Sequence, residues 1–277
     1  MRQEEDSPLG PVVWREELGS TNDEALERLA RGESPPFVVW TGRQTAGRGQ
    51  GTNRWWSTEG ALTFSVAIAP DTYSLPVERW PCLALASAVA VCRAVDGWVS
   101  PHTGDGRGAA IKWPNDVWWG DRKLAGVLVE RPRGAAGVDQ AGQGGLVVGV
   151  GLNLNNRIED TAIPGVKGVS VCEVDGREHP IEPCLYRLLD ELHRAWGELG
   201  KGDRELAREW GRRSCLDGRR IRVRVGESVH EGICGGLAED GTLRLWERNE
   251  ATGLVGEARM VAGRVEILRD QDDANGW

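Results

Sequence analysis

Two short segments, far apart along the chain, constrain this protein more than any other feature. The first is the loop G-R-Q-T-A-G-R-G-Q-G from Gly42 to Gly51, and the second is I-K-W-P-N-D from Ile111 to Asp116. Glycine lets a backbone take positive φ angles and approach a ligand closely. Arginine supplies a planar, permanently charged fork that suits phosphate or carboxylate. Together the two segments predict a site for a small anionic molecule, such as a nucleotide phosphate.

The glycine loop does not match the two common nucleotide-binding motifs. No Gly-Lys-Ser/Thr follows it, so it is not a P-loop, and a strand-like segment follows where a dinucleotide fingerprint needs a helix. A solvated hairpin tip is the simpler alternative. Backbone N–H groups in such a loop can also form a nest for phosphate oxygens. The loop alone therefore indicates anion binding without identifying the ligand.

Lys112 is the candidate cation of the second segment. A lysine at a strand end usually lies in solvent. Here the Trp113-Pro114 corner follows at once and restricts the local backbone. We therefore expect the Lys112 ammonium to have a defined direction.

Two further polar residues have simpler interpretations. Lys123 is expected to be a surface cation that pairs with Asp121 or Glu130. Asn153 can be a loop amide that satisfies nearby backbone groups, as asparagine often does.

A helix start at Ser20-Thr21-Asn22 offers a second set of donors. Thr21, with Glu24 three residues later, fits a capping box, and an apolar face follows. The N-terminus of a helix presents free N–H groups and a partial positive charge. Capping and ligand contact can coexist at this position.

The remaining sequence predicts an α+β protein with a small all-β module at its C-terminal end. A polar loop rich in glycine is expected over 134–145, and another loop over 97–109. Residues 117–119 and 123–130 flank a turn and predict a hairpin. The alternation of apolar residues and arginines after residue 216 indicates a module of SH3-like size. Strands are expected over 12–18, 37–41, 61–68, 146–151, 221–225, 232–237, 243–246 and 265–268. One helix is expected to begin at residue 21, and three further helices are expected over 77–95, 182–199 and 204–213. The expected division is a tail 1–11, a catalytic domain 12–213, a β-domain 214–269 and a tail 270–277.

Composition limits the partners and the setting. The net charge of −8 and the pI of about 5.2 argue against nucleic acid as a bulk partner. No apolar run is expected to cross a membrane, which takes ~20 residues. The six cysteines form no C-x-x-C pair and indicate free thiols in a reducing cytoplasm. The four histidines have no metal-ligand spacing, so no protein-bound metal is expected.

The succession of these segments resembles biotin–protein ligases over residues 12–268. In order, the segments are Ser20-Thr21-Asn22, Q-T-A-G-R-G-Q-G at 44–51, K-W-P-N-D at 112–116, R-K-L-A-G-V-L-V-E at 122–130 and G-V-G-L-N at 149–153. The resemblance implies the mixed-sheet catalytic domain of biotin and lipoate ligases with an SH3-like barrel. It also implies an enzyme that converts biotin and MgATP to biotinyl-5′-adenylate and then biotinylates a lysine of biotin carboxyl carrier protein or an equivalent carboxylase domain.

The resemblance also implies site residues. Lys112 and Arg48 would be catalytic. The implied biotin-binding residues are Ser20, Thr21, Asn22, Gln44, Gly47, Arg48, Gly49, Gln50, Lys112 and Gly126. The implied nucleotide-binding residues are Arg48, Arg54, Trp55, Lys112, Asn115 and Asn153, with Mg²⁺ carried by the nucleotide phosphates.

Two departures from the family pattern stand out. Gln50 occupies a position where many members have arginine, so one phosphate cation is missing. Only eleven residues precede the first expected strand, which leaves no room for the DNA-binding domain of members that are also repressors. We therefore expect a ligase without DNA binding; a homodimer remains open. The alternatives are a lipoate or octanoate ligase or transferase of the same fold, and a non-catalytic acyl or nucleotide sensor.

Overall fold

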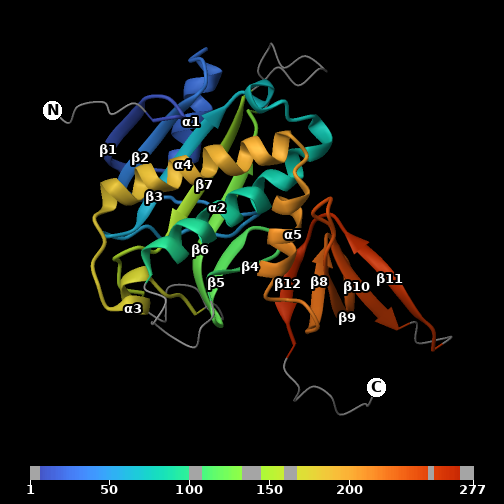
Figure 1. Ribbon diagram of the computed structural model, residues 1–277. Coiled ribbons are helices and arrows are strands. Elements are labelled where there is room, and N and C mark those ends of the chain that lie inside the picture. Colours follow the sequence, from blue (N-terminus) through green and yellow to red (C-terminus); the bar gives the residue numbers. More distant parts are fainter. Residues whose placement is uncertain (1–6, 100–107, 133–144, 159–166, 249–252, 269–277) are drawn as a thin grey trace.

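The larger part of the protein is built on one seven-stranded mixed sheet. The computed structural model describes residues 7–99, 108–132, 145–158, 167–248 and 253–268. In the sheet, the strand order is β1-β2-β3-β7-β6-β5-β4, and only β1 and β2 pair in parallel (Figure 1). The strands are β1 Val12–Leu18, β2 Phe37–Gln44, β3 Leu62–Ile68, β4 Ala110–Lys112, β5 Asp116–Trp119, β6 Arg122–Glu130 and β7 Leu146–Leu152. The expected α+β class is confirmed.

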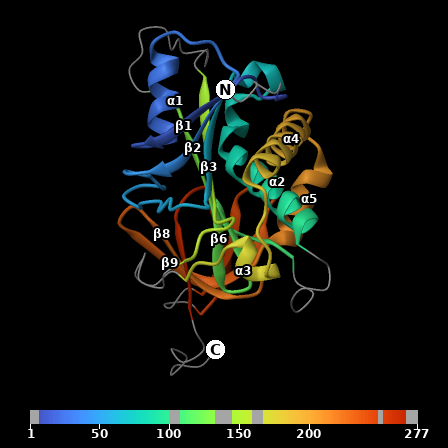
Figure 2. The ribbon, with the colours of Figure 1, turned by 90° about the vertical axis from the view of Figure 1, so that its left-hand side faces the viewer.

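Helices cover both faces of this sheet because its central strands are apolar on both sides. Figure 2 shows α1 on one face and α2, α4 and α5 on the other. Along β2, Phe37 and Val39 pack toward α1, whereas Val38 and Trp40 belong to the larger core under α2 and α4. The helices are α1 Thr21–Ala30, α2 Leu83–Trp98, α3 Val171–Asp175, α4 Ile181–Gly200 and α5 Arg204–Arg213, with 3₁₀ turns η1 Pro70–Tyr73 and η2 Val77–Cys82.

A second, antiparallel sheet of five strands follows α5. Its strand order is β11-β10-β9-β8-β12, so that the last strand among the described residues pairs with the first strand of the module. The strands are β8 Arg220–Val225, β9 Ser228–Leu237, β10 Leu243–Arg248, β11 Val255–Met260 and β12 Arg264–Ile267. The expected C-terminal β-module is thus present.

Hydrogen bonds from the part built on the first sheet fix the position of the second sheet. The buried indole of Trp113 donates to the Gly241 carbonyl oxygen at 3.0 Å, and the Trp210 indole donates to the Ala238 carbonyl oxygen at 3.1 Å. The Cys215 amide donates to the Ile111 carbonyl oxygen at 2.9 Å. The tryptophan of the K-W-P-N-D segment therefore joins the two sheets, a role that the sequence did not reveal.

Several sequence expectations need correction. The expected helix 77–95 is a 3₁₀ turn containing Pro81 followed by α2, because proline cannot supply the amide that a continuous helix needs. The cap of α1 is Ser20, whose hydroxyl accepts from the Asp23 amide, so the expected Thr21–Glu24 capping box is wrong. Strands β4 and β11 and helix α3 were not expected. Leu9 is fully buried, so the folded structure begins before Val12.

The segment Val77–Trp98 is long and apolar enough to span a membrane by length and composition, contrary to the sequence expectation. In the protein, 67% of its most apolar window is buried, and α2 lies between the sheet and α4 (Figure 2). It is the central helix of the core. The expected loop over 134–145, most of the loop over 97–109 and the tail 270–277 lie outside the described residues.

Candidate active site

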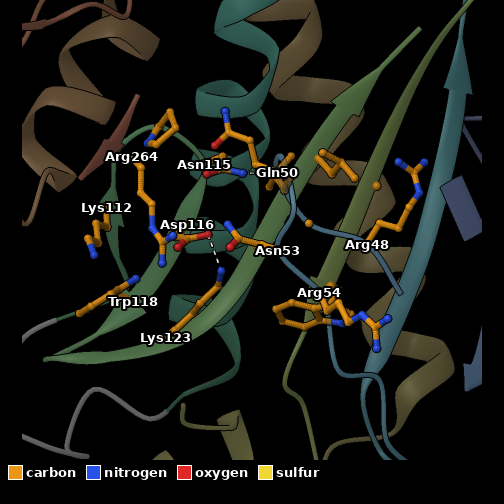
Figure 3. Close-up of a pocket in the computed structure, with 18 of the residues that line it drawn as sticks. Arg48, Gln50, Asn53, Arg54, Lys112, Asn115, Asp116, Trp118, Lys123 and Arg264 are labelled. Carbon is orange, nitrogen blue, oxygen red and sulfur yellow. Dashed lines mark hydrogen bonds and ion pairs between the residues drawn. The ribbon is translucent and has the colours of Figure 1, made fainter. Parts of the chain in front are cut away.

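One large cavity gathers most of the predicted site residues. Its volume is about 1360 Å³, and it is bounded by the start of α1, the segment between β2 and β3, strands β4–β7 and part of the second sheet. Figure 3 shows Arg48 at one side of this cavity and Lys112 at the opposite side. The lining includes the predicted residues Ser20, Thr21, Asn22, Gln44, Arg48, Gly49, Gln50, Arg54, Trp55, Lys112, Asn115 and Gly126.

The start of α1 forms one polar end of the cavity. Gln44, at the end of β2, accepts hydrogen bonds from the Thr21 amide at 2.7 Å and from the Thr21 hydroxyl at 3.1 Å. Ser20 caps the helix and is almost fully buried. Because these hydrogen bonds join β2 to α1, the polar groups at this end are held in fixed positions. They can recognise a small polar group without rearranging.

Asn22 extends this polar end toward β6 and β7. Its Oδ1 lies 2.5 Å from the Ser65 hydroxyl, and its Nδ2 donates to Glu130 Oε2 at 2.9 Å. A Cβ atom on Gly149 would lie 2.0 Å from Asn22 Oδ1. Glycine at this position in the G-V-G-L-N segment is therefore required for the close approach of Asn22 to β7.

Arg48 is paired with carboxylates and does not reach toward Lys112. Its Nη1 and Nη2 atoms donate to Glu130 Oε1 and Oε2 at 2.7 and 2.6 Å, and Nη2 lies 2.7 Å from Asp23 Oδ1. The hydrogen bond with Glu130 is the main reason that the pKa of Arg48 is raised. The two carboxylates thus compensate the positive charge of the guanidinium, which joins the glycine loop to α1 and β6.

The glycine loop folds back on itself at the cavity wall. The Gly49 amide donates to the Asn53 carbonyl oxygen at 2.8 Å, and the Trp55 amide donates to the Gly47 carbonyl oxygen at 3.0 Å. A Cβ atom on Gly47 would lie 2.4 Å from the Trp55 carbonyl oxygen, so this turn needs glycine. Gly47 itself is not among the residues that line the cavity.

Lys112 lies at the end of β4, above the indole of Trp118. Its Nζ is 4.4 Å from the ring centroid, a cation–π geometry. Burial lowers the pKa of Lys112, and the nearby charge of Asp116 opposes that shift. The ammonium is thus partly desolvated and is held over the Trp118 ring, which agrees with the defined direction expected from the sequence.

Lys123 belongs to the site, contrary to its expected place as a surface cation. Its Nζ lies 2.7 Å from Asp116 Oδ1 and 5.8 Å from the centroid of the Trp55 ring. The partner is Asp116 on the neighbouring strand, neither Asp121 nor Glu130. Both Lys123 and Asp116 line the cavity. The alternation of strand residues could have placed Lys123, but its partner depends on the β5–β6 register.

Asn115 and Asn153 are engaged with the backbone. The side-chain nitrogen Nδ2 of Asn115 donates to the Val127 carbonyl oxygen at 2.6 Å, and Asn115 lines the cavity. The side-chain nitrogen Nδ2 of Asn153 lies 3.4 Å from the Lys123 carbonyl oxygen, and its Oδ1 accepts a hydrogen bond from Asn156 Nδ2 at 3.1 Å. Asn153 is buried and does not line the cavity, as the simpler sequence interpretation anticipated. Its nucleotide-binding role remains a prediction.

The second sheet supplies cavity residues that sequence reasoning missed. Arg219, Arg224 and Arg264 line the cavity together with Glu266. The arginine-rich alternation of β8 was visible in the sequence, but nothing there showed that this strand faces the cavity. Among the described residues, no group of three or more His, Cys, Asp or Glu side chains could hold a metal ion.

Comparisons with known proteins identify the family of this chain. The Biotin/lipoate A/B protein ligase family matches residues 16–153. A biotin–[acetyl-CoA-carboxylase] ligase of Paracoccus denitrificans is 31% identical over 229 residues, which cover 82% of this chain and 90% of the relative. One from Mycobacterium tuberculosis is 29% identical over 240 residues, 84% of either chain. A solved biotin protein ligase from Aquifex aeolicus, in complex with biotin and ATP, shares the fold with a TM-score of 0.74 at 24% identity, over 93% of this chain and 98% of that one. The chain therefore belongs to the biotin protein ligases of the biotin/lipoate A/B protein ligase family.

Proposed function

We propose that this protein activates biotin with ATP and transfers it to a lysine of an acceptor protein. In the first step, a carboxylate oxygen of biotin attacks the α-phosphorus of ATP, the bond to the bridging oxygen breaks and pyrophosphate leaves. In the second step, a lysine amine of the acceptor attacks the acyl carbon of biotinyl-5′-adenylate. The acyl–oxygen bond breaks, AMP leaves with the electron pair and the amine loses a proton.

The observation that carries this proposal is a single cavity that joins the fixed polar groups of α1 to the Lys112 cation. Biotin has one polar ureido group on a largely apolar body. Such a ligand needs a few well-placed hydrogen-bonding groups and apolar walls. Thr21, Asn22 and Gln44 supply the polar end, and Val127 and Val150 contribute apolar wall. We place the ureido group of biotin at this end.

Lys112 then lies where the reacting phosphate would be. Adenylation concentrates negative charge around the α-phosphorus, and preorganised cations stabilise that charge most effectively where water is excluded. Lys112 is half-buried, and the indole of Trp118 covers one side of its ammonium group. Arg54, Trp55 and Asn115 border the same cavity and are assigned to the nucleotide. Mg²⁺ would arrive with the phosphates, since Mg²⁺ commonly keeps several waters and binds through substrate phosphates.

The acceptor is proposed to be a biotin carboxyl carrier protein or an equivalent carboxylase domain. Relatives from two organisms carry the name biotin–[acetyl-CoA-carboxylase] ligase. A cytoplasmic location and the absence of a DNA partner, which the net charge of −8 favours, belong to the proposal at the same level.

The decisive experiment is acid-dependent exchange of labelled pyrophosphate into ATP. The protein is mixed with ATP, labelled pyrophosphate and biotin, lipoate or octanoate in separate reactions. Exchange driven by biotin alone supports the proposal, and exchange driven by lipoate or octanoate supports an acyl ligase of the other specificity. If no acid drives exchange although biotin binds, the protein is a sensor and the proposal fails.

A further inference from the structure

The chain contains few side chains that an acyl-adenylate can acylate. Of the 34 lysine and arginine residues, only four are lysines: Lys112, Lys123, Lys167 and Lys201. A guanidinium stays protonated in proteins and offers no free electron pair to an acyl carbon, whereas a lysine amine can lose its proton and attack. Lys112, Lys123 and Lys167 line the cavity. The amines are thus concentrated where the adenylate is proposed to form.

Two of the three cavity lysines are held by their neighbours. Lys112 Nζ lies 4.4 Å from the centroid of the Trp118 ring. Lys123 Nζ lies 2.7 Å from Asp116 Oδ1, as Figure 3 shows. An aromatic face and a carboxylate both favour the charged ammonium form, which has no electron pair for attack. Burial acts in the opposite direction on Lys112, so this lysine is the main competitor for acylation inside the cavity.

Lys167 lies beside Lys123 but has no contact of this kind. Its carbonyl oxygen accepts a hydrogen bond from the Lys123 amide at 2.8 Å, and the Val169 amide donates to the Lys123 carbonyl oxygen at 3.0 Å. These bonds hold the backbone on either side of Gly168 against β6. The Lys167 side chain is exposed and makes no hydrogen bond or ion pair with another residue in the described ranges. A fixed backbone therefore presents an unpaired amino group at the cavity wall.

Lys201 offers a matched control elsewhere on the molecule. It is the C-cap of α4, is exposed and is not among the residues that line the cavity. Like Lys167, it has no carboxylate partner within the part of the chain that the structure describes. The two lysines therefore differ mainly in their distance from the site of the adenylate.

We propose that Lys167 is a self-acylation site, which accepts the biotinyl group of biotinyl-5′-adenylate when no acceptor protein occupies the cavity. This inference rests on the proposed function, which supplies the adenylate. The uncharged Nζ atom attacks the acyl carbon and forms an amide bond. The acyl–oxygen bond breaks, AMP leaves with the electron pair, and the proton of the amine passes to water. The step needs no further reactant.

Proximity favours Lys167 over the lysines of other molecules. Lysine carries its amine on a flexible four-carbon stem. A group on a short flexible tether has an effective concentration on the order of 1 mM at its target, which is roughly a thousandfold above that of a second copy present at about 1 μM. Self-acylation should therefore occur within one molecule, and its rate per molecule should not change on dilution.

The test incubates the full chain with biotin and ATP in the absence of acceptor protein. Intact mass spectrometry should show the addition of one biotinyl group, and peptide mapping should place it on Lys167. Lys167→Arg keeps the charge and removes the nucleophile, so it should lose most of the label per adenylate formed, with adenylate measured as released pyrophosphate. The control Lys201→Arg should keep the label. Added carrier protein should suppress labelling of Lys167, because its lysine competes for the same intermediate.

A mixing experiment shows whether the step is intramolecular. The wild type is incubated with an equal amount of a size-tagged Lys112→Ala copy, which is expected to form little adenylate of its own. Label confined to the wild-type copy supports attack within one molecule. Equal labelling of the two copies, or of Lys167 and Lys201, would show acylation by adenylate free in solution and would overturn the inference.

Label on Lys112 or Lys123 in place of Lys167 would also overturn it. Synthetic biotinyl-5′-adenylate, added without ATP, separates this inference from the proposed function. If biotin drives no pyrophosphate exchange but the added adenylate labels Lys167, the proposed function fails and the acylation site stands. If biotin drives exchange and neither route labels Lys167, the inference alone fails.

Discussion

Arg48 and Glu130, 82 positions apart in the sequence, form a two-pronged ion pair with nitrogen–oxygen distances of 2.7 and 2.6 Å. Glu130 also accepts a hydrogen bond from Asn22. One carboxylate thus connects the glycine loop to the start of α1, where biotin is placed. The order of the loop and the geometry of the biotin pocket therefore depend on the same side chain.

Replacing Glu130 with glutamine should weaken biotin binding more than it weakens the fold. Loss of a charge-assisted contact costs about 1 kcal/mol or more, which corresponds to roughly fivefold in affinity. The effect on stability should be below about 1 kcal/mol, since the Arg48 side chain is 37% exposed. Calorimetry with biotin and hydrogen exchange at the Gly49 and Trp55 amides measure the two effects. Glu17→Gln, which breaks the exposed pair with Arg43, is the control and should change neither.

Lys112→Ala should remove most adenylation and leave the fold intact. Loss of one preorganised donor to a developing charge costs about 3 kcal/mol, or more than a hundredfold in rate. Single-turnover formation of biotinyl-adenylate measures the loss, and circular dichroism with thermal unfolding checks the fold. Lys112→Arg should recover part of the rate because the charge is kept. Equal adenylate formation by Lys112→Ala and the wild type would contradict the assignment.

The alkaline limb of the pH profile should report Lys112. Burial lowers the pKa of this lysine, so its ammonium group loses its proton and its charge at a lower pH than an ordinary lysine does. Exchange measured as kcat/KM should therefore fall as pH rises through that lowered pKa, because kcat/KM reports on the free enzyme. Above it, and below the usual lysine pKa, stability should rise with pH, since the unfolded chain binds more protons. In Lys112→Arg the limb should move to higher pH; an unmoved limb would assign it to another group.

Gly149→Ala should disrupt the pocket by displacing Asn22. The added Cβ would lie 2.0 Å from Asn22 Oδ1, well inside contact distance. We expect a loss of about 1–3 kcal/mol in unfolding free energy, as in other overpacked sites, together with impaired biotin binding. The control is Gly197→Ala in α4, where a Cβ would meet no atom within 4 Å. That change should raise stability by up to about 1 kcal/mol. Chemical denaturation and biotin calorimetry on both variants give the comparison.

The parts of the fold that could be predicted from the sequence are those set by local patterns. The alternation over β3 and the apolar run of β7 identify both strands. The alternation indicated a half-buried β3, but the polar residues Thr63 and Ser65 are buried as well because α1 covers that face. Strand β4 has only three residues and exists because β5 pairs with it. Strand β11 carries glycine and charged residues and is defined by its pairing with β10. Neither pairing partner can be read from a local window.

The same reasoning explains the residues of the site. Lys112 and the glycine loop were identified because their residue types and neighbours indicate anion chemistry. Lys123 was misplaced because its partner, Asp116, is fixed only by the β5–β6 register. Arg264 was missed because its place depends on how the second sheet docks, which involves the Trp113 indole and the Gly241 carbonyl oxygen. Contacts between domains have no local sequence signature.

Gln50 leads to the last prediction, on how long the reactive intermediate stays bound. It lies in the glycine loop, lines the cavity and is labelled in Figure 3; its side chain is exposed and its carbonyl oxygen accepts from the Asn53 amide at 3.2 Å. A neutral amide can donate to a phosphate oxygen but lacks charge assistance, which makes the bond about half as strong. Biotinyl-adenylate should therefore leave the wild type about fivefold faster than it leaves Gln50→Arg.

The dissociation rate of preformed adenylate, measured by chase with unlabelled biotin and ATP, tests this directly. Gln50→Glu should release the adenylate fastest, because its carboxylate repels the phosphate, so the expected order of rates is Glu, Gln, Arg. Released adenylate acylates exposed lysines, and the biotinylation of a bystander protein such as albumin should follow the same order. Lys112, Arg54 and Arg264 also border this cavity, and they could hold the phosphate without help from residue 50. In that case the three rates would be equal, and the glutamine would have no consequence for retention of the intermediate.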